Sequence, residues 1–287
     1  MNYIQAGNDA AGQPVELFYT DWGTGRPVVL IHGWPLDHQM WEYQAVYLAQ
    51  NGCRVITYDR RGFGKSSHPW QGYDYDTLAD DLKAVLDALD LQDVTLVGFS
   101  MGGGEVARYF GRHGGARVAQ VAFVSAVTPF LLKTDDNPDG VDQSAFDDIV
   151  TGLTKDRADF LNDFGPQFYG SGPLGVGAAV SKAQLDWTLA MAMPASPKAT
   201  LDCVSSWAAT DFRADVPAVN VPTLIVHGKN DKAVPAESSA DKLAALLPAA
   251  TYLRYDGHGH GLHMTAKDQL NDDLLRFVGG DGADAAA

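Results

Sequence analysis

The feature that most constrains this chain is a serine held between two glycines where a strand gives way to a helix. The pentapeptide at 98–102, Gly-Phe-Ser-Met-Gly, closes an apolar run at 94–99 and precedes a helix-compatible segment at 105–109. Glycines let neighbouring backbone approach a tight turn where a Cβ would clash. This strand–turn–helix context predicts that Ser100 is a nucleophile at the edge of a sheet. The alternative is a serine that merely caps the helix, and the pentapeptide alone does not separate the two.

Around this turn, strand-like and helix-like segments alternate along most of the 287 residues. That alternation predicts an α/β fold, a mostly parallel central sheet flanked by helices. Besides 94–99, we expect strands at 28–31, 54–58, 118–125, 223–227 and 251–255. We also expect a helix capped by Asp76, one from about 236 to 246, and a final amphipathic helix. The apolar positions that define the first and last of these helices are Leu78, Leu82, Val85, Leu86, Leu89, Leu270, Leu274 and Phe277.

The alternation lapses between about 130 and 210, where Asp, Gly, Pro and aromatic residues are frequent. We interpret this stretch as a helical cap inserted over the carboxyl ends of the strands, where ligands bind in parallel sheets. The predicted organisation is a core formed by residues 1–129 and 211–278, a cap at 130–210, and a flexible tail at 279–287.

A serine nucleophile needs a base and an acid that orients it, following it along the chain in the order acid, then histidine. Asp231 lies in the turn after the expected strand at 223–227 and is the candidate acid. Its rivals, Asp211 and Asp215, precede that strand and so belong to its other end. The candidate bases after the last strand are His258, His260 and His263; we favour His260, with His258 next.

Two backbone N–H groups must hold the oxyanion that forms on the substrate. Met101, the residue after the nucleophile, supplies one in this arrangement. The second should come from the turn His-Gly-Trp-Pro at 32–35, after the early strand. Pro35 has no N–H, so the backbone of Trp34 is the expected donor.

Composition excludes several other functions. A net charge of −15 argues against nucleic acid or an anionic membrane as partner. The first ten residues do not resemble a signal peptide, and the apolar runs are too short to span a bilayer. Two cysteines, Cys53 and Cys203, are too few for a disulfide framework, which favours a cytoplasmic location. We find no cluster with metal-ligand spacing and expect no metal or cofactor.

Longer segments resemble one family specifically. HGWPLDHQMW at 32–41, YDRRGFGKSS at 58–67, DVTLVGFSMGGGEVARY at 93–109 and CVSSWAATDFRADV at 203–216 are similar to the cofactor-free haloperoxidases. These form a subgroup of the α/β hydrolases with perhydrolases, aryl esterases and γ-lactamases. The resemblance extends over about residues 14–278. It implies the α/β-hydrolase fold, a triad of Ser100, Asp231 and His260, and oxyanion donors at Trp34 and Met101.

The chain departs from the family beside the base, where members usually carry Ala-Pro and this sequence has His258-Gly259. We expect a looser loop there and an additional titrating group. Candidate residues for the acyl pocket are Pro35, Phe99, Val127, Phe130, Phe168, Trp207 and Ala233. At Ala233 the family often has bulkier residues, so we expect more room for the acyl chain in this protein.

The resemblance implies a serine carboxylester hydrolase that passes an acyl group from Ser100 to water or hydrogen peroxide. With peroxide the product is a peracid, which oxidises halide in solution. The implied partners are a small ester or a short carboxylic acid, and family members are often homo-oligomers. The alternatives are a γ-lactamase or amidase with the same triad, and a catalytically silent ligand receptor of the same fold.

Overall fold

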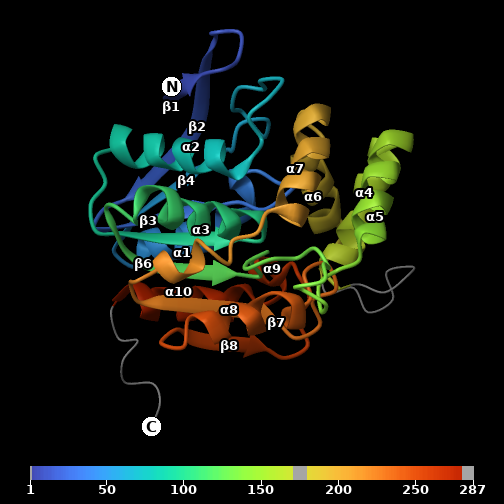
Figure 1. Ribbon diagram of the computed structural model, residues 1–287. Coiled ribbons are helices and arrows are strands. Elements are labelled where there is room, and N and C mark those ends of the chain that lie inside the picture. The colour runs from blue at the N-terminus through green and yellow to red at the C-terminus, as the bar shows by residue number, and fades with distance from the viewer. Residues whose placement is uncertain (1, 171–179, 280–287) are drawn as a thin grey trace.

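The computed structural model describes residues 2–170 and 180–279. An eight-stranded sheet in the order β1-β2-β4-β3-β5-β6-β7-β8 forms the centre of the molecule (Figure 1). From β4 to β8 neighbouring strands are parallel, while β2 pairs antiparallel with both β1 and β4. The expected fold class is therefore confirmed. The strands are β1 Tyr3–Asn8, β2 Pro14–Gly23, β3 Arg26–Ile31, β4 Cys53–Tyr58, β5 Val94–Phe99, β6 Val118–Val124, β7 Thr223–Gly228 and β8 Thr251–Tyr255.

Helices cover both faces of this sheet because its central strands are apolar on both sides. Side chains alternate along β5, so that Leu96 joins one core cluster and Val97 the other. The first cluster is completed by α2 (Tyr75–Ala88), α3 (Met101–His113) and α8 (Ala240–Leu246), the second by α1 (Glu42–Gln50) and α10 (Lys267–Gly279). All strands from β3 to β7 are thereby shielded, and their carboxyl ends share one edge.

Four details of the sequence-based assignment were wrong. The β1–β2 hairpin was not expected at all. Helix α2 is capped by Asp74, which accepts the Thr77 N–H at 3.0 Å, and not by Asp76, which lies in its first turn. The expected helix from 236 is broken into the 3₁₀ turn η4 (Ala236–Ser238) and α8. Leu89, expected on the buried face of α2, is half-buried at the end of that helix.

In the described part of the stretch between β6 and β7, four α-helices stand beyond one end of the sheet (Figure 1). We call them the cap: α4 (Gln143–Lys155), α5 (Arg157–Phe168), α6 (Lys182–Ala192) and α7 (Pro197–Ala209). They pack against one another in pairs, α4 on α5, α5 on α6 and α4 on α7. The remaining short elements are η1 (His38–Trp41), η3 (Val216–Ala218) and α9 (Leu262–Thr265). The tail expected from 279 lies, beyond its first residue, outside the described residues.

Candidate active site

Ser100 stands at the sharp turn between β5 and α3. Its backbone has φ 53° and ψ −118°, a left-handed conformation that is unfavourable for any residue with a Cβ. Hydrogen bonds fix this turn, because the Ser100 N–H donates to Val124 O at 2.9 Å and the Val127 N–H to Ser100 O at 3.2 Å. The Ser100 hydroxyl makes no side-chain cap to α3 and contacts His260 instead. The structure therefore rejects the helix-cap alternative.

The glycines on either side of Ser100 are required by close contacts. A Cβ at Gly98 would lie 2.6 Å from Gly102 O, and one at Gly102 would lie 2.7 Å from Ile31 O. Real Cβ atoms do not approach carbonyl oxygens this closely, so any other residue would push β5, α3 and the end of β3 apart. Both glycines let the strand turn directly into the helix.

The residues predicted for a triad lie together. His260 Nε2 is 2.9 Å from Ser100 Oγ, and His260 Nδ1 is 2.7 Å from Asp231 Oδ2. All three are nearly inaccessible to solvent, with 6%, 3% and 6% exposure for Ser100, His260 and Asp231. This is the geometry in which imidazole accepts the hydroxyl proton while the carboxylate holds its tautomer.

Hydrogen-bond donors in the loop after β7 stabilise the ionised form of the Asp231 carboxylate. Its Oδ1 accepts the N–H groups of Ala233 and Val234 at 3.0 and 2.8 Å. His227 Nε2 lies 3.3 Å from Oδ2 and donates to Val234 O at 2.8 Å. Burial alone would raise the pKa of this carboxyl, but His260 and His227 outweigh it and hold the pKa well below its ordinary value. Sequence analysis did not single out His227, which reaches Asp231 from the end of β7.

The other candidate acids and bases lie elsewhere. His258 Nδ1 bonds to Thr265 Oγ1 at 3.0 Å, while Asp211 and Asp215 pair with Arg213 and Arg108. The loop after β8 is held in place, since the Asn230 N–H donates to His258 O at 2.9 Å and the Gly261 N–H to Phe168 O at 2.8 Å. These bonds argue against the looser loop expected from His258-Gly259.

His263 is fully buried among Phe99, Phe168, Tyr169 and Trp41, and neither ring nitrogen has a hydrogen-bond partner in the described part of the chain. Burial, aided by His260, lowers its pKa to about 3. Its ring is therefore neutral at neutral pH and packs among the aromatic rings next to His260.

Both expected oxyanion donors are free to act. Within residues 2–170 and 180–279, the backbone N–H groups of Trp34 and Met101 have no hydrogen-bond partner. Met101 is the first residue of α3, whose amino-terminal end carries partial positive charge. The Trp34 indole is occupied, because its Nε1 donates to Thr200 O at 3.0 Å. This bond ties the turn after β3 to the cap.

A buried polar cluster lies beneath these donors, and we call its members, Tyr58, Arg60, Glu105 and His32, the Arg60 cluster. Arg60 pairs with Glu105, which also accepts the Tyr58 hydroxyl at 2.7 Å. Arg60 donates to His32 O at 2.6 Å from its side chain and to His32 Nε2 at 2.9 Å from its backbone. Burial and the adjacent Arg60 lower the pKa of His32 well below its usual value, so its ring stays neutral. The cluster joins α3 to the turn that carries Trp34.

A cavity of about 630 Å³ opens in front of the triad, between the sheet and the cap. Among the residues predicted to bind substrate, Val127, Phe168, Trp207 and Ala233 line it, together with Trp34, Ser100 and His260. Three others do not. Phe99 packs behind His260 at 5.0 Å between ring centroids, Phe130 lies under the Arg213 guanidinium at 5.0 Å, and Pro35 is buried outside the lining.

Much of the cavity wall comes from α4 and α5, which sequence analysis did not resolve into lining residues. Apolar side chains from these helices and from the loop after β7 add Phe146, Ile149, Phe160, Phe164 and Val234. Their apolar spacing is typical of amphipathic helices, but only the fold shows which helix face meets the residues around Ser100.

The structure also brings together Asp37, His38 and Asp59, a group that the sequence did not suggest as metal ligands. Asp59 already accepts three hydrogen bonds, because Oδ1 accepts from the His38 backbone N–H and from His38 Nδ1 at 2.8 and 2.7 Å, and Oδ2 accepts from the Lys65 N–H at 2.8 Å. Asp37 caps η1 by accepting the Gln39 N–H at 2.8 Å. These hydrogen bonds explain why the three side chains lie together, because they hold the turn after β3 in place.

The comparisons with known proteins agree with this geometry. Residues 26–267 match the family described as alpha/beta hydrolase fold, and the chain belongs to that family. It is 46% identical over 278 residues to a putative non-heme chloroperoxidase of Synechocystis sp., covering 97% of this chain and 100% of that protein. A bifunctional esterase/perhydrolase of Acinetobacter calcoaceticus is 40% identical, covering 92% and 96%.

Among solved structures, a bromoperoxidase from Bacillus anthracis superimposes with a TM-score of 0.91 at 45% identity, covering 96% of this chain and 98% of that one. The predicted relationship to cofactor-free haloperoxidases, perhydrolases and esterases is confirmed. The chain is therefore an enzyme of the α/β-hydrolase family, of the non-heme haloperoxidase and esterase type.

Proposed function

We propose that this protein is a serine carboxylester hydrolase that also forms peracids, with Ser100 as nucleophile, His260 as general base and Asp231 as its orienting acid. The observation that carries the proposal is the 2.9 Å contact between Ser100 Oγ and His260 Nε2, at the inner end of an apolar cavity. The named relatives with esterase, perhydrolase and haloperoxidase activities support the same chemistry.

In the first half-reaction, His260 Nε2 takes the hydroxyl proton as Ser100 Oγ bonds to the ester carbonyl carbon. The negative charge passes to the carbonyl oxygen and is held by the N–H groups of Trp34 and Met101. When the carbon–oxygen bond to the alcohol breaks, His260 returns its proton to the leaving oxygen. The alcohol departs, and the acyl group stays on Ser100.

In the second half-reaction, His260 removes a proton from water, whose oxygen attacks the acyl carbonyl. The tetrahedral adduct collapses, Ser100 recovers the proton, and a carboxylic acid is released. Hydrogen peroxide in place of water gives the peracid. A free carboxylic acid can also load Ser100, with water as the leaving group. The peracid then transfers an oxygen atom to bromide or chloride outside the cavity, giving hypohalous acid and the carboxylate.

The substrates of this scheme are a small ester or short carboxylic acid and either water or peroxide. We place the reaction in a reducing compartment, the cytoplasm, a location supported by the two cysteines, Cys53 and Cys203, which are buried and free. None of the helices in the described part of the chain has the length and apolar character that crossing a bilayer requires.

The test compares wild type and Ser100→Ala in hydrolysis of p-nitrophenyl acetate and in peracetic acid formation from acetate and peroxide. We expect both activities to fall together by about 10³-fold or more, because they share one acyl-enzyme. Circular dichroism and thermal unfolding check that the variant is folded. Peroxide-dependent bromination that survives in the folded variant would contradict the shared intermediate.

A further inference from the structure

The outer part of the cavity is lined by charged side chains of one predominant sign. Exposed aspartates from α4, α5 and the junction between them contribute Asp148, Asp156, Asp159 and Asp163, and two exposed lysines, Lys155 and Lys232, also line it. Four negative charges against two positive ones leave a net negative mouth. In the described ranges of the chain, none of the six makes an ion pair. The stretches 171–179 and 280–287 contain no lysine or arginine.

The inner part of the same cavity is apolar. Its wall consists of aromatic rings around Ser100 and His260, contributed by Trp34, Phe146, Phe160, Phe164, Phe168 and Trp207. A group that reaches Ser100 must leave water, pass the aspartates and enter this wall. A charge on that group therefore changes its free energy of binding in two ways. The aspartates at the mouth attract or repel it, and the apolar wall imposes a desolvation penalty inside.

The aspartates form no binding site of their own, because the site is the cavity that the triad defines. They act instead on which substrates enter the cavity. Apolar walls concentrate the field of charges at the mouth of a cleft, so the net negative mouth lowers the local concentration of anions and raises that of cations. The aromatic wall adds a further preference, since ring faces attract cations and offer nothing to carboxylates.

We propose that this chain selects esters whose group within the cavity is uncharged or positively charged, and that it discriminates against carboxylate anions. The inference rests on the proposed function and names the substrate class of that same site. It also ranks acyl donors for peracid formation. A neutral ester should load Ser100 more readily than the free acid, which at neutral pH arrives at the cavity as its anion.

The experiment uses three phenyl esters with equal chain length and different charge. Their acyl groups are trimethylammonio-butyryl, its neutral isostere with a tert-butyl group in place of the trimethylammonium, and the monoanion of glutaryl. Phenol release gives kcat/KM for each. At low ionic strength we expect the anionic ester to be at least about fivefold poorer than the neutral one. At about 1 M salt, where the screening length is ~3 Å, we expect this difference to shrink.

The variant that tests the mouth replaces the three aspartates at the start and along the length of α5, Asp156→Asn, Asp159→Asn and Asp163→Asn. Asparagine at 156 keeps the cap of α5, where Asp156 accepts the Asp159 N–H at 3.1 Å. The matched control makes the same change in net charge at exposed positions outside the cavity, Asp93→Asn, Asp135→Asn and Asp268→Asn. Thermal unfolding of both proteins verifies that they are folded.

We expect the anionic-to-neutral ratio of kcat/KM to rise about threefold in the α5 variant at low salt, and to change less than half as much in the control. Equal rises in the two variants would assign the selectivity to net charge and overturn the role of the mouth. Equal kcat/KM for all three esters in wild type would overturn the charge preference while leaving the esterase intact. No hydrolysis of any of the three esters would overturn the proposed function and, with it, this inference.

Discussion

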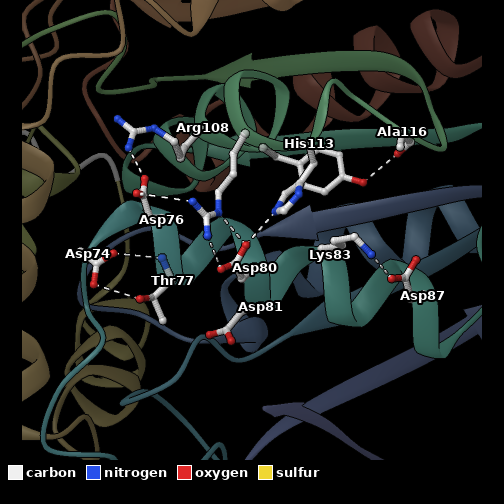
Figure 2. A network of polar contacts seen from close by, with 12 residues as sticks. Asp74, Asp76, Thr77, Asp80, Asp81, Lys83, Asp87, Arg108, His113 and Ala116 are labelled. Carbon is white, nitrogen blue, oxygen red and sulfur yellow. Dashed lines mark hydrogen bonds and ion pairs between the residues drawn. The ribbon is translucent and has the colours of Figure 1, made fainter. Parts of the chain in front are cut away.

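The Arg60 cluster and the ion pairs between α2 and α3 use the same residue types in opposite surroundings. In the Arg60 cluster both charged side chains are 1% exposed. Between α2 and α3, the carboxylates Asp76 and Asp80 are 52% and 47% exposed and face Arg108, Arg112 and His113 (Figure 2). The first network joins α3, which follows the proposed nucleophile, to the turn that carries Trp34, and the second joins two helices on the outer surface.

This difference in solvent exposure decides what each network can do. In low dielectric, charges interact strongly and cannot be left without a partner, so a buried pair fixes geometry at the risk of a large penalty when broken. At the surface, water and salt weaken each pair, and holding long side chains costs entropy. We therefore expect substitutions in the interior to change activity and folding, and those between α2 and α3 to change stability slightly.

The largest effect is expected at Asp231, the proposed triad acid. Asp231→Asn keeps the shape of the side chain but replaces an oxygen that accepts from His260 by an amide that can donate to it, favouring the wrong tautomer. We expect kcat for ester hydrolysis to fall about 10⁴-fold, with KM changing much less. Steady-state kinetics on p-nitrophenyl acetate measures this. A loss of less than tenfold would show that Asp231 does not orient the base.

The second effect concerns folding. Glu105→Gln removes one charge of the buried pair and leaves Arg60 uncompensated, so we expect unfolding free energy to fall by about 3–5 kcal/mol. Urea denaturation measures the loss. The double variant Arg60→Met with Glu105→Leu removes both charges and should recover much of it. If the single and double variants are equally destabilised, the cost arises from packing and not from the unpaired charge.

A third prediction uses pH. Since the folded protein holds the pKa of His263 at about 3, below the ordinary value of 6.5, the unfolded chain binds a proton there first as pH falls. The stabilising contribution of neutral His263 is thus complete above about pH 6.5 and is lost as pH falls towards 3. In His263→Phe we expect the loss of stability between about pH 7 and 5 to be smaller by roughly 1–2 kcal/mol. Equal pH dependence in wild type and variant would contradict this.

The parallel part of the sheet could be predicted from the sequence because its central strands are short apolar runs. Such runs indicate strands that are buried on both faces of a sheet. Strands β5 and β8 were predicted to the residue. The β1–β2 hairpin escaped because only Ile4, Val15 and Leu17 of its residues are buried, while the others are exposed or half-buried, as at an antiparallel edge. The α2 cap was misplaced because Asp74 and Asp76 both suit a helix start locally. Only the tertiary pairing of Asp76 with Arg108 separates them.

The residues of the site likewise fall into those that the sequence predicts and those that only the fold reveals. Chain order and turn position were sufficient to propose Ser100, Asp231 and His260, since each follows a predicted strand. The pocket residues depend on how the cap packs, which no local pattern records. Phe130 is an example, because stacking under Arg213 and not a ligand accounts for its burial. The aspartates at the mouth of the cavity likewise have the pattern of an ordinary solvent-exposed helix face. Their position beside the cavity follows only from the packing of α5 in the fold.

The smallest effect is expected between α2 and α3, and it is the sharpest test of the contrast with the interior. Arg112 bonds to Asp80 at 2.7 Å, but their side chains are 41% and 47% exposed. For Arg112→Ala we expect a loss of unfolding free energy of no more than about 1 kcal/mol at low salt, vanishing at about 1 M salt. Esterase kcat/KM should not change, because no member of this network contacts the triad or the cavity. Chemical denaturation with urea at both salt concentrations, alongside the Glu105→Gln protein, provides the measurement. A salt-independent loss of several kcal/mol in Arg112→Ala would mean that the outer network is as tightly coupled to the fold as the buried one, and exposure would no longer explain the difference between them.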